Sequence, residues 1–268
     1  MAFRGHGFGP VSPSFLSEVV SYSRTTGVII QADNCSVTML DAEIRCVIPS
    51  GVGSQFSWYV SVGGQLSNAA DVQTSYAAPI VSYVSVGDTN ARSTLISTAG
   101  TAIVYIVGDM FGEDEDAVSL FINGVLQVSS VAIVVPHTLI SFPAPVAEGY
   151  SLSLTLIVGG QAAVFPAGND SLIIGGPTVA TISIAEVAGS PPMLCAASVN
   201  PGTTRLIVLG INFGSGRNTT LRLDDVPCPL VEASHTRLVC ITSTCAGECC
   251  VCSEFDFLCV FGCHLCAL

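Results

Sequence analysis

The feature that most limits how this chain can fold is an internal repeat. FSWYVSVGGQLS at residues 56–67 aligns with LSLTLIVGGQAA at residues 152–163, an offset of 96, and both segments contain VGGQ. PIVSYVSV at residues 79–86 aligns in the same way with PTVATISI at residues 177–184, an offset of 98. A repeat of this spacing indicates that one small structural unit is built several times within the 268 residues, in place of one large domain.

The repeats predict four parts of the chain. Residues 1–78 form a module that lacks its first strand, and residues 79–176 form a complete module. Residues 177–250 form a third module that is incomplete at its C-terminal end, because no alternating strand and no VGGQ follow Cys240. Residues 251–268 form a cysteine-rich tail. We therefore expect a fragment, or an incomplete gene model, of a longer tandem array, and we name the three modules repeat 1, repeat 2 and repeat 3.

Apolar and polar residues alternate in the segment before each VGGQ. Phe56, Trp58 and Val60 are separated by Tyr and Ser residues. This period of two is typical of a strand with one buried face. Short strands of this kind recur between turn signals, and no helical pattern of useful length interrupts them. The sequence therefore predicts an all-β fold of tandem immunoglobulin-like β-sandwiches, with about seven strands in each module.

A glycine-rich pattern, G-x-x-F-G, occurs once in each repeat. Its residues are Gly5, Phe8 and Gly9, then Gly108, Phe111 and Gly112, and finally Gly210, Phe213 and Gly214. These glycines recur without a recurring polar or charged partner, so we interpret the pattern as architecture and not as a cradle for a substrate. We expect the first glycine to relieve the end of a strand, the phenylalanine to turn inward, and the last glycine to adopt a backbone conformation that other residues resist.

The order of motifs along a repeat resembles that of the IPT/TIG family. It runs P-x-V-x-x-I, G-T-x-x-x-I, G-x-N-F-G, a strand with P-C, S-x-T-x-L-x-C, and an alternating strand that ends in VGGQ. The resemblance covers residues 1–245 and is carried by three copies. IPT/TIG domains are immunoglobulin-like domains of plexins, transcription factors and large cell-surface proteins, fibrocystin-like proteins among them. The resemblance implies IPT/TIG-type sandwiches and a receptor-like or adhesion role.

Two pairs of cysteines are predicted to form disulfides. Cys35 and Cys46 stand in repeat 1, and Cys228 and Cys240 stand at the equivalent places of repeat 3. Repeat 2 lacks both partners, and Phe142 takes the place of the second. Joint presence and joint absence is what a bonded pair predicts, although small buried thiols remain the alternative. Closing so short a loop contributes about 2 to 3 kcal/mol, and a disulfide implies an oxidising compartment.

Three N-x-S/T triplets agree with an extracellular location. They begin at Asn34, Asn169 and Asn218, and each is a candidate site of N-glycosylation. Asn169 and Asn218 are the better candidates, because Cys35 is the middle residue of the first triplet.

The end of the chain has its own group of cysteines. They are Cys245, Cys249, Cys250, Cys252, Cys259, Cys263 and Cys266, together with His264. Their spacing only loosely fits a zinc site, and an odd number argues against a complete disulfide framework. A cysteine-rich extracellular extension, a disordered tail and a translated artefact stay open as interpretations of residues 246–268.

The charge of the chain excludes one class of partner. Acidic residues number 20 and basic residues 8, so the net charge is −12. A phosphate backbone would be repelled over most of such a surface, which argues against nucleic-acid binding. No apolar run reaches the length of about 18 residues that a membrane-spanning helix needs, so no membrane insertion by this segment is expected.

No residue pattern predicts catalysis, a cofactor or a metal centre. His137 and His235 occupy equivalent positions that Asp41 takes in repeat 1, which is typical of a turn. The acidic residues Glu113–Asp116 could supply oxygen ligands to Ca²⁺, but they occur in one repeat only and a solvated loop is the favoured interpretation. The chain also contains no G-x-S-x-G elbow and no H-E-x-x-H motif.

These observations predict a non-catalytic part of a secreted or cell-surface protein. Sandwiches joined by very short linkers are expected to act as a semi-rigid spacer, in adhesion, or in recognition of a protein or glycan ligand at loops at the module ends. Neighbouring modules of the same chain are the other expected partners. The alternatives are an accessory region of a secreted carbohydrate-active or other enzyme, and the dimerisation domain of a transcription factor.

Overall fold

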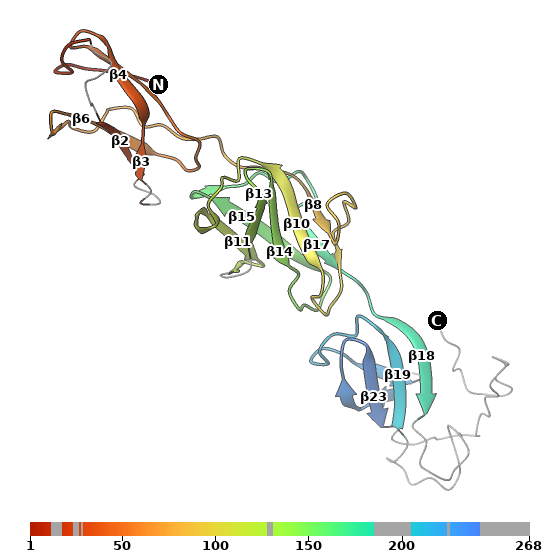
Figure 1. Ribbon diagram of the computed structural model, residues 1–268. Coiled ribbons are helices and arrows are strands. Elements are labelled where there is room, and N and C mark those ends of the chain that lie inside the picture. The colour runs from red at the N-terminus through yellow and green to blue at the C-terminus, as the bar shows by residue number, and fades with distance from the viewer. Residues whose placement is uncertain are drawn as a thin grey trace, which may run out of the picture. The chain divides into compact units, whose positions relative to one another are not determined.

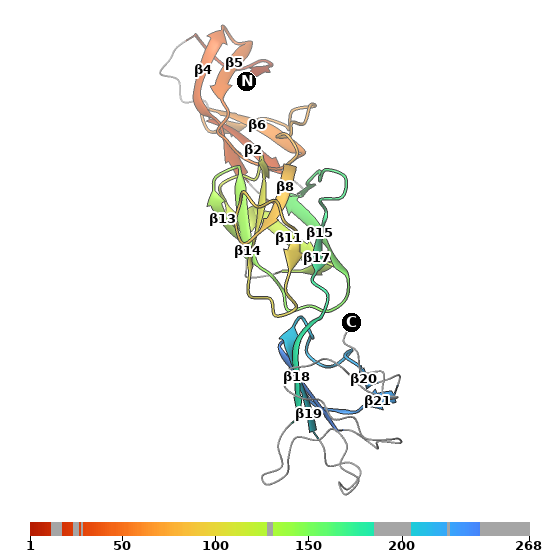
Figure 2. The same ribbon diagram turned by 90° about the vertical axis from the view of Figure 1, so that its right-hand side faces the viewer.

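The computed structural model describes residues 1–11, 18–23, 27, 29–127, 131–184, 205–223 and 226–241 (Figures 1 and 2). The chain forms two compact units. The first contains Met1–Thr94, Ile103–Pro143 and Leu152–Leu172, and the second contains Leu95–Ala102, Ala144–Ser151 and the described residues from Ile173 onward. The cysteine-rich tail lies outside the described residues.

The described chain consists of short strands and one turn of 3-10 helix. Repeat 1 contains β1 (Ala2–Arg4), β2 (Glu18–Ser23), β3 (Ile29–Gln31), β4 (Asp33–Met39), β5 (Glu43–Val47), β6 (Phe56–Val62) and β7 (Gln65–Leu66). Repeat 2 contains β8 (Ile80–Val86), β9 (Leu95–Ile96), β10 (Ile103–Asp109), η1 (Glu115–Ala117), β11 (Val118–Ile122), β12 (Val125–Leu126), β13 (Ala132–Val135), β14 (Leu139–Pro143), β15 (Ser151–Val158), β16 (Gln161–Ala162) and β17 (Ser171–Ile174). Repeat 3 contains β18 (Thr178–Ile184), β19 (Arg205–Ile211), β20 (Leu221–Leu223), β21 (Val226–Cys228), β22 (Leu230–Ala233) and β23 (Arg237–Ile241). The prediction of an all-β fold is confirmed.

The strand order of repeat 2 is that of an immunoglobulin-like sandwich. One sheet has the order β13-β14-β10-β8, and the other has the order β12-β11-β15-β17-β9. If the strands are lettered along the chain as A (β8), B (β10), C (β11), D (β13), E (β14), F (β15) and G (β17), the sheets are ABED and CFG, as in immunoglobulin domains. The short strand β9 runs parallel to β17, and the other pairings recorded within these sheets are antiparallel.

The alternation of apolar residues determines which face of each strand is buried. In β15 the residues Leu152, Leu154, Leu156 and Val158 are at most 6% exposed, whereas the intervening Ser and Thr residues are exposed. Residues Val104 and Ile106 of β10 are fully buried in the same way. The side chains between the two sheets are therefore the apolar ones that the period of two predicts.

Repeats 1 and 3 contain sheets of the same kind. Repeat 1 has the orders β1-β5-β4 and β3-β2-β6-β7, and repeat 3 has the orders β18-β19-β23-β22 and β20-β21. In repeat 1 the ring centroids of Phe3 and Trp58 lie 5.5 Å apart within a cluster that also contains Ile44 and Phe56. In repeat 3, Leu206, Val208 and Leu238 pack with both cysteines. The described chain is thus built of tandem immunoglobulin-like β-sandwiches.

Glu43 is a carboxylate that the alternating pattern would not place in the interior. Its side chain is nearly buried, and its oxygens accept hydrogen bonds from Thr38 Oγ1 at 2.8 Å, Arg45 Nε at 2.8 Å and Arg4 Nε at 3.2 Å. These three donors lie on β4, β5 and β1, so the carboxylate joins all three strands of its sheet. The hydrogen bond from Thr38 and those from Arg45 and Arg4 lower the pKa of Glu43 from 4.5 to about 2.

Acid is expected to destabilise repeat 1 through this carboxylate. Because the folded pKa of about 2 lies below the ordinary 4.5, the unfolded chain takes up the proton first as the pH falls. The stabilising contribution is complete above pH 4.5 and is lost as the pH falls toward 2. Urea unfolding followed through the fluorescence of Trp58, the single tryptophan of the chain, measures this change. Glu43→Gln should flatten the pH dependence in this range.

The control for this prediction is Glu232→Gln, because Glu232 forms an ion pair with Arg237 in repeat 3 and both side chains are exposed. That variant should keep the native pH dependence of the Trp58 signal. If Glu43→Gln also kept it, the assigned role of Glu43 would be wrong.

Candidate functional site

The three G-x-x-F-G loops share one geometry. Phe8, Phe111 and Phe213 are buried, with exposed fractions of 7%, 0% and 5%. The last glycines, Gly9, Gly112 and Gly214, have φ angles of 80°, 77° and 77°, in the left-handed region that favours glycine. Each loop therefore turns sharply beside a phenylalanine that fills the end of its sandwich.

The first glycine of the pattern lies in close contact with a neighbouring strand and with the phenylalanine ring. A Cβ atom on Gly108 would lie 2.1 Å from the carbonyl oxygen of Ile80 and 2.5 Å from Cζ of Phe111. A Cβ atom on Gly210 would lie 2.0 Å from the carbonyl oxygen of Thr178 and 2.5 Å from Cζ of Phe213. The glycine is required because the phenylalanine ring and the neighbouring strand both lie against its Cα, and not only because a strand ends there.

Each loop is held by the turn that contains the predicted turn residue. In repeat 2 the backbone N–H of Phe111 donates to the carbonyl of His137 at 3.0 Å, and the N–H of His137 donates to the carbonyl of Gly112 at 2.7 Å. Asp41 N–H donates to the Gly9 carbonyl at 2.9 Å in repeat 1, and Phe213 N–H donates to the His235 carbonyl at 3.0 Å in repeat 3. These contacts use backbone atoms, which explains why histidine and aspartate can exchange at this position. His137 and Asp41 also have positive φ angles of 64° and 59°.

The VGGQ segment of repeat 2 binds the end of repeat 1 within the first compact unit. The side-chain amide of Gln161 donates to the carbonyl oxygens of Gly53 at 2.9 Å and Tyr76 at 3.3 Å. A Cβ atom on Gly159 would lie 2.6 Å from the backbone N of Gly53, so only glycine permits this approach. We call this set of contacts the first joint.

Tyr76, whose carbonyl accepts from Gln161 at the first joint, is itself held by contacts within repeat 1. Its hydroxyl donates to the carbonyl of Pro49 at 2.8 Å, and its ring packs edge-on against Phe56 with centroids 5.7 Å apart. Burial raises the pKa of the Tyr76 phenol, so the hydroxyl stays protonated and remains a donor at neutral pH. The joint thus combines tight backbone packing with a small number of directed hydrogen bonds.

The acidic loop that follows Phe111 lies beside a cavity of 760 Å³ near the first joint. Its carboxylates make separate local contacts. Asp114 accepts from the N–H of Asp116 at 3.0 Å, Glu115 accepts from the N–H of Ile133 at 3.0 Å, and Glu113 lies 3.4 Å from Nε2 of His137. No group of three metal-ligating side chains occurs among the described residues. The carboxylates stabilise this loop and are not gathered around a common centre.

A second joint, within the second compact unit, uses the G-x-x-F-G loop of repeat 3. A carboxylate oxygen of Glu148 accepts hydrogen bonds from the backbone N–H of Ser215 and from its hydroxyl, and the other oxygen accepts from Nδ2 of Asn218 at 3.2 Å. The hydrogen bonds from Ser215 lower the pKa of Glu148. Asn212 Oδ1 accepts from the N–H of Thr98 at 3.3 Å.

His235 adds a further contact to the second joint. Its Nδ1 lies 2.9 Å from Oγ1 of Thr98. The same turn position therefore holds the loop of its own repeat through backbone atoms and contacts the preceding repeat through its side chain.

The four cysteines of the predicted pairs are bonded in the structure. Cys35 on β4 is joined to Cys46 on β5, and Cys228 on β21 is joined to Cys240 on β23. The first cysteine of the pair is thus on β4 in repeat 1 but on β21 in repeat 3, so the two bonds do not join equivalent strands. In the register of the paired strands, Cys240 of β23 lies opposite Leu206 of β19. Phe142 of β14 lies opposite Val104 of β10 in the same way, so Phe142 and Cys240 hold equivalent positions. Phe142 is 1% exposed, so its ring belongs to the core of repeat 2.

The candidate glycosylation residues lie at different depths. Asn34 and Asn218 are exposed and Asn169 is half-buried. Among the described residues, no helix is long and apolar enough to cross a membrane.

Comparisons with known proteins found similarity among solved structures alone. No protein-family model matches the chain, and no curated protein matches it. Among solved structures, it is similar to SGBP-B from a complex xyloglucan utilization locus in Bacteroides uniformis, with 16% identity and a TM-score of 0.28, over 78% of this chain and 56% of that chain. It is also similar to the plexin A4 full extracellular region, domains 1 to 10, with 12% identity and a TM-score of 0.33, over 92% of this chain and 20% of that chain.

A third similar structure is the I9–I11 tandem from titin, with 10% identity and a TM-score of 0.29, over 92% of this chain and 84% of that chain. The chain thus spans only part of the length of the first two structures. At these TM-scores the similarity assigns no function, and the immunoglobulin-like fold rests on the strand order of the protein itself.

Proposed function

We propose that this chain is a non-catalytic stretch of an extracellular protein and that it acts as a spacer of IPT/TIG-type modules joined end to end. The modules correspond to residues 1–78, 79–176 and 177–250. Adhesion or recognition of a protein or glycan would take place at loops that the spacer holds apart.

The observation that carries this proposal is the reuse of the repeated motifs in the two joints. Gly159 and Gln161, which belong to the second VGGQ, contact the end of repeat 1, and the loop with Phe213 contacts the end of repeat 2. The second VGGQ and the third G-x-x-F-G loop are therefore occupied in folding and in joining repeats. This structural use of the motifs explains why they recur without catalytic residues beside them.

Two disulfides support the extracellular part of the proposal. The Cys35–Cys46 and Cys228–Cys240 bonds require an oxidising environment to persist. The side chain of Asn34 is exposed and accessible for glycosylation in that compartment, whereas Nδ2 of Asn218 donates to Glu148 in the second joint. The excess of acidic residues, which gives a net charge of −12, also suits solubility outside the cell better than binding to nucleic acid.

Gln161→Ala tests whether the joint restricts motion between repeats. The variant removes two hydrogen bonds to backbone carbonyls, and at about 1 kcal/mol for each bond the open fraction of the joint should rise roughly 5- to 30-fold. NMR relaxation would show repeat 1 tumbling more independently of repeat 2. Gln65→Ala is the matched control, because Gln65 is the equivalent residue of repeat 1 and is exposed. Equal tumbling in the native protein and both variants would contradict the spacer role.

A further inference from the structure

The two end segments of repeat 2 run parallel to each other and are hydrogen-bonded within the first compact unit. The N-terminal segment begins at Pro79 and continues into β8, and the C-terminal segment leads from Val164 into β17. Val81 N–H donates to the carbonyl of Val164 at 2.9 Å, and Val164 N–H donates to the carbonyl of Pro79 at 3.0 Å. Ile80 and Val164 thus form a parallel bridge, which we call the end bridge.

A second parallel contact joins the same two segments within the second compact unit. Leu95 of β9 lies opposite Ile173 of β17, and Ile96 lies opposite Ile174. Gly175 N–H donates to the carbonyl of Ile96 at 2.9 Å. The residues that follow the start of the repeat are therefore paired with those that lead to its end.

Parallel pairing determines how a pull on the two ends of repeat 2 acts on these hydrogen bonds. A pull at the N-terminal end draws the first segment back toward Pro79, and a pull at the C-terminal end draws β17 onward, toward Gly176. Because the paired segments run in the same direction, the two pulls slide them past each other, and the bonds between them are strained together. If the segments ran antiparallel, the same pull would separate them one hydrogen bond at a time.

The start of β8 is held from its other side by the G-x-x-F-G motif. Val81 lies opposite Gly108 in the register of β8 and β10, and Val81 is 1% exposed. A Cβ atom on Gly108 would lie 2.1 Å from the carbonyl oxygen of Ile80, so the two strands approach closely where a pull enters the repeat. The first residues of the repeat therefore lie between β10 and Val164.

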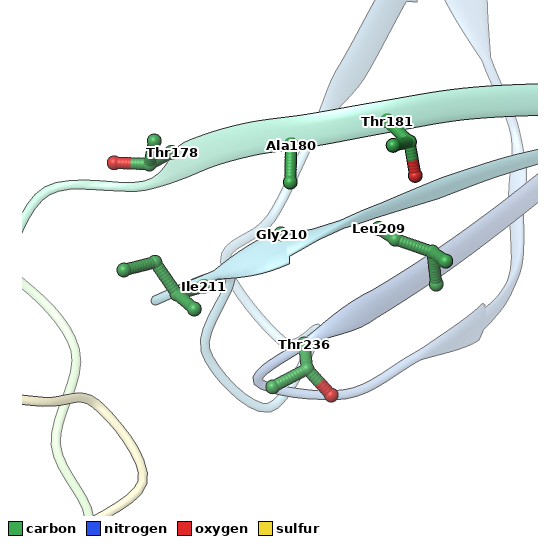
Figure 3. A pocket seen from close by; sticks show the side chains of 7 residues that line it. All are labelled: Thr178, Ala180, Thr181, Leu209, Gly210, Ile211 and Thr236. Atoms are coloured by element: carbon green, nitrogen blue, oxygen red, sulfur yellow. The ribbon is translucent and has the colours of Figure 1, made fainter.

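Repeat 3 begins with the same close approach. Figure 3 shows the start of β18 beside the end of β19, where Thr178 is opposite Ile211. A Cβ atom on Gly210 would lie 2.0 Å from the carbonyl oxygen of Thr178. A counterpart of Val164 would stand after residue 241, outside the described residues, so the inference concerns repeat 2.

Repeat 2 also has no disulfide of its own. Residues 79–176 contain no cysteine, whereas repeats 1 and 3 each contain a disulfide. A disulfide keeps the loop that it closes from lengthening when the chain is stretched. The resistance of repeat 2 to stretching therefore depends on hydrogen bonds and packing alone.

We propose that repeat 2 withstands tension along the chain, and that the end bridge and the pairing of β9 with β17 are the contacts that resist it. The proposal rests on the spacer role, because a spacer attached at both ends is placed under tension. The two can still fail separately, since the relaxation of Gln161→Ala reports on the first joint and stretching reports on repeat 2. Repeats that tumble independently, with a repeat 2 that resists sliding, would contradict the spacer role alone.

Stretching single molecules of the full chain between peptide tags at its two termini tests the proposal. Unfolding of repeat 2 is recognised by the released length, on the order of 300 Å, because no disulfide holds part of it back. A slide of about one residue, ~3.3 Å, is enough to break the bonds of a parallel pair. The unfolding rate of the native chain should therefore rise with force as for a transition state only a few Å from the folded state. A distance of about 10 Å or more would show that the ends are peeled apart and would overturn the proposal.

Val164→Pro tests the end bridge, because proline removes the N–H that donates to Pro79. Loss of this bond should speed the unfolding of repeat 2 under tension roughly fivefold or more, and by more than it speeds unfolding in urea. Val134→Pro is the matched control. Val164 and Val134 are 61% and 51% exposed, but Val134 lies on β13, an edge strand that carries neither end of the repeat.

Circular dichroism would establish that both proline variants fold, and the force dependence of the native chain needs no variant. The control should speed unfolding under tension by no more than it does in urea. Equal effects of the two substitutions under tension, or a native unfolding rate in Val164→Pro, would overturn the proposal.

Discussion

Replacing Phe111 by alanine should lower the free energy of unfolding of repeat 2 by about 3 to 5 kcal/mol. The ring is fully buried and lies against Gly108, so its removal leaves a cavity that the backbone on either side cannot easily close. The loop around it is also fixed by the hydrogen bonds between Phe111, Gly112 and His137, which limits collapse into the space. Hydrogen exchange of the amides of β10 and β14, resolved by residue, would measure the loss in this repeat.

Tyr150→Ala is the control for this prediction. Tyr150 is an aromatic residue of the same repeat and is 93% exposed, so its removal should change the stability by no more than about 0.5 kcal/mol. A loss below about 1 kcal/mol in Phe111→Ala would mean that the ring does not support the end of the sandwich.

The fold was predictable from the sequence because its information is local and repeated. Alternation in β15 alone indicates which residues face the core, and the internal repeat shows that this reading applies more than once. The buried Phe142 was also recognisable, because it occupies the place of a cysteine in two related segments. The sequence pattern is sufficient to predict those features of the fold that depend only on which side chains are apolar.

The contacts at the two joints were not predictable because many of the hydrogen-bonding atoms in them belong to the backbone. Gln161 donates to the carbonyls of Gly53 and Tyr76, and no sequence pattern marks a carbonyl that is free to accept. Glu148 was missed for a similar reason, since its partners in the loop after Phe213 lie far away in sequence. The internal repeat contained one usable signal, the glutamine of the second VGGQ, which is a polar side chain at the end of an apolar strand.

Glu43 was missed because a carboxylate in a strand is normally assigned to the solvent-facing side. Its burial is possible only because Arg4 and Arg45 supply donors from two strands. The pairing of β1 with β5 brings Arg4 opposite Glu43, and this pairing is a tertiary contact that alternation alone does not specify.

The other large effect is expected at the first glycine of the motif, where Gly108→Ala should destabilise repeat 2 by about 3 kcal/mol. The new Cβ would lie 2.1 Å from the carbonyl oxygen of Ile80, which is backbone and cannot rotate away, so β8 must shift from β10 at this point. Combining the change with Phe111→Ala should relieve the contact with the ring but not the contact with β8. The loss in the double variant should therefore fall short of the sum of the two single losses while remaining larger than that of Phe111→Ala alone.

Gly176→Ala is the matched control for Gly108→Ala. Gly176 has no atom within 4 Å of an added Cβ, and its φ lies outside the left-handed region, so the same substitution should change stability by no more than about 0.5 kcal/mol. Chemical denaturation followed by circular dichroism would compare the two variants directly. Equal stability in both would show that the close approach of β8 to Gly108 is not what selects glycine there. Recurrence of the motif glycine would then have to come from the flexibility of the loop, since glycine differs from alanine in the unfolded chain as well as in the folded one.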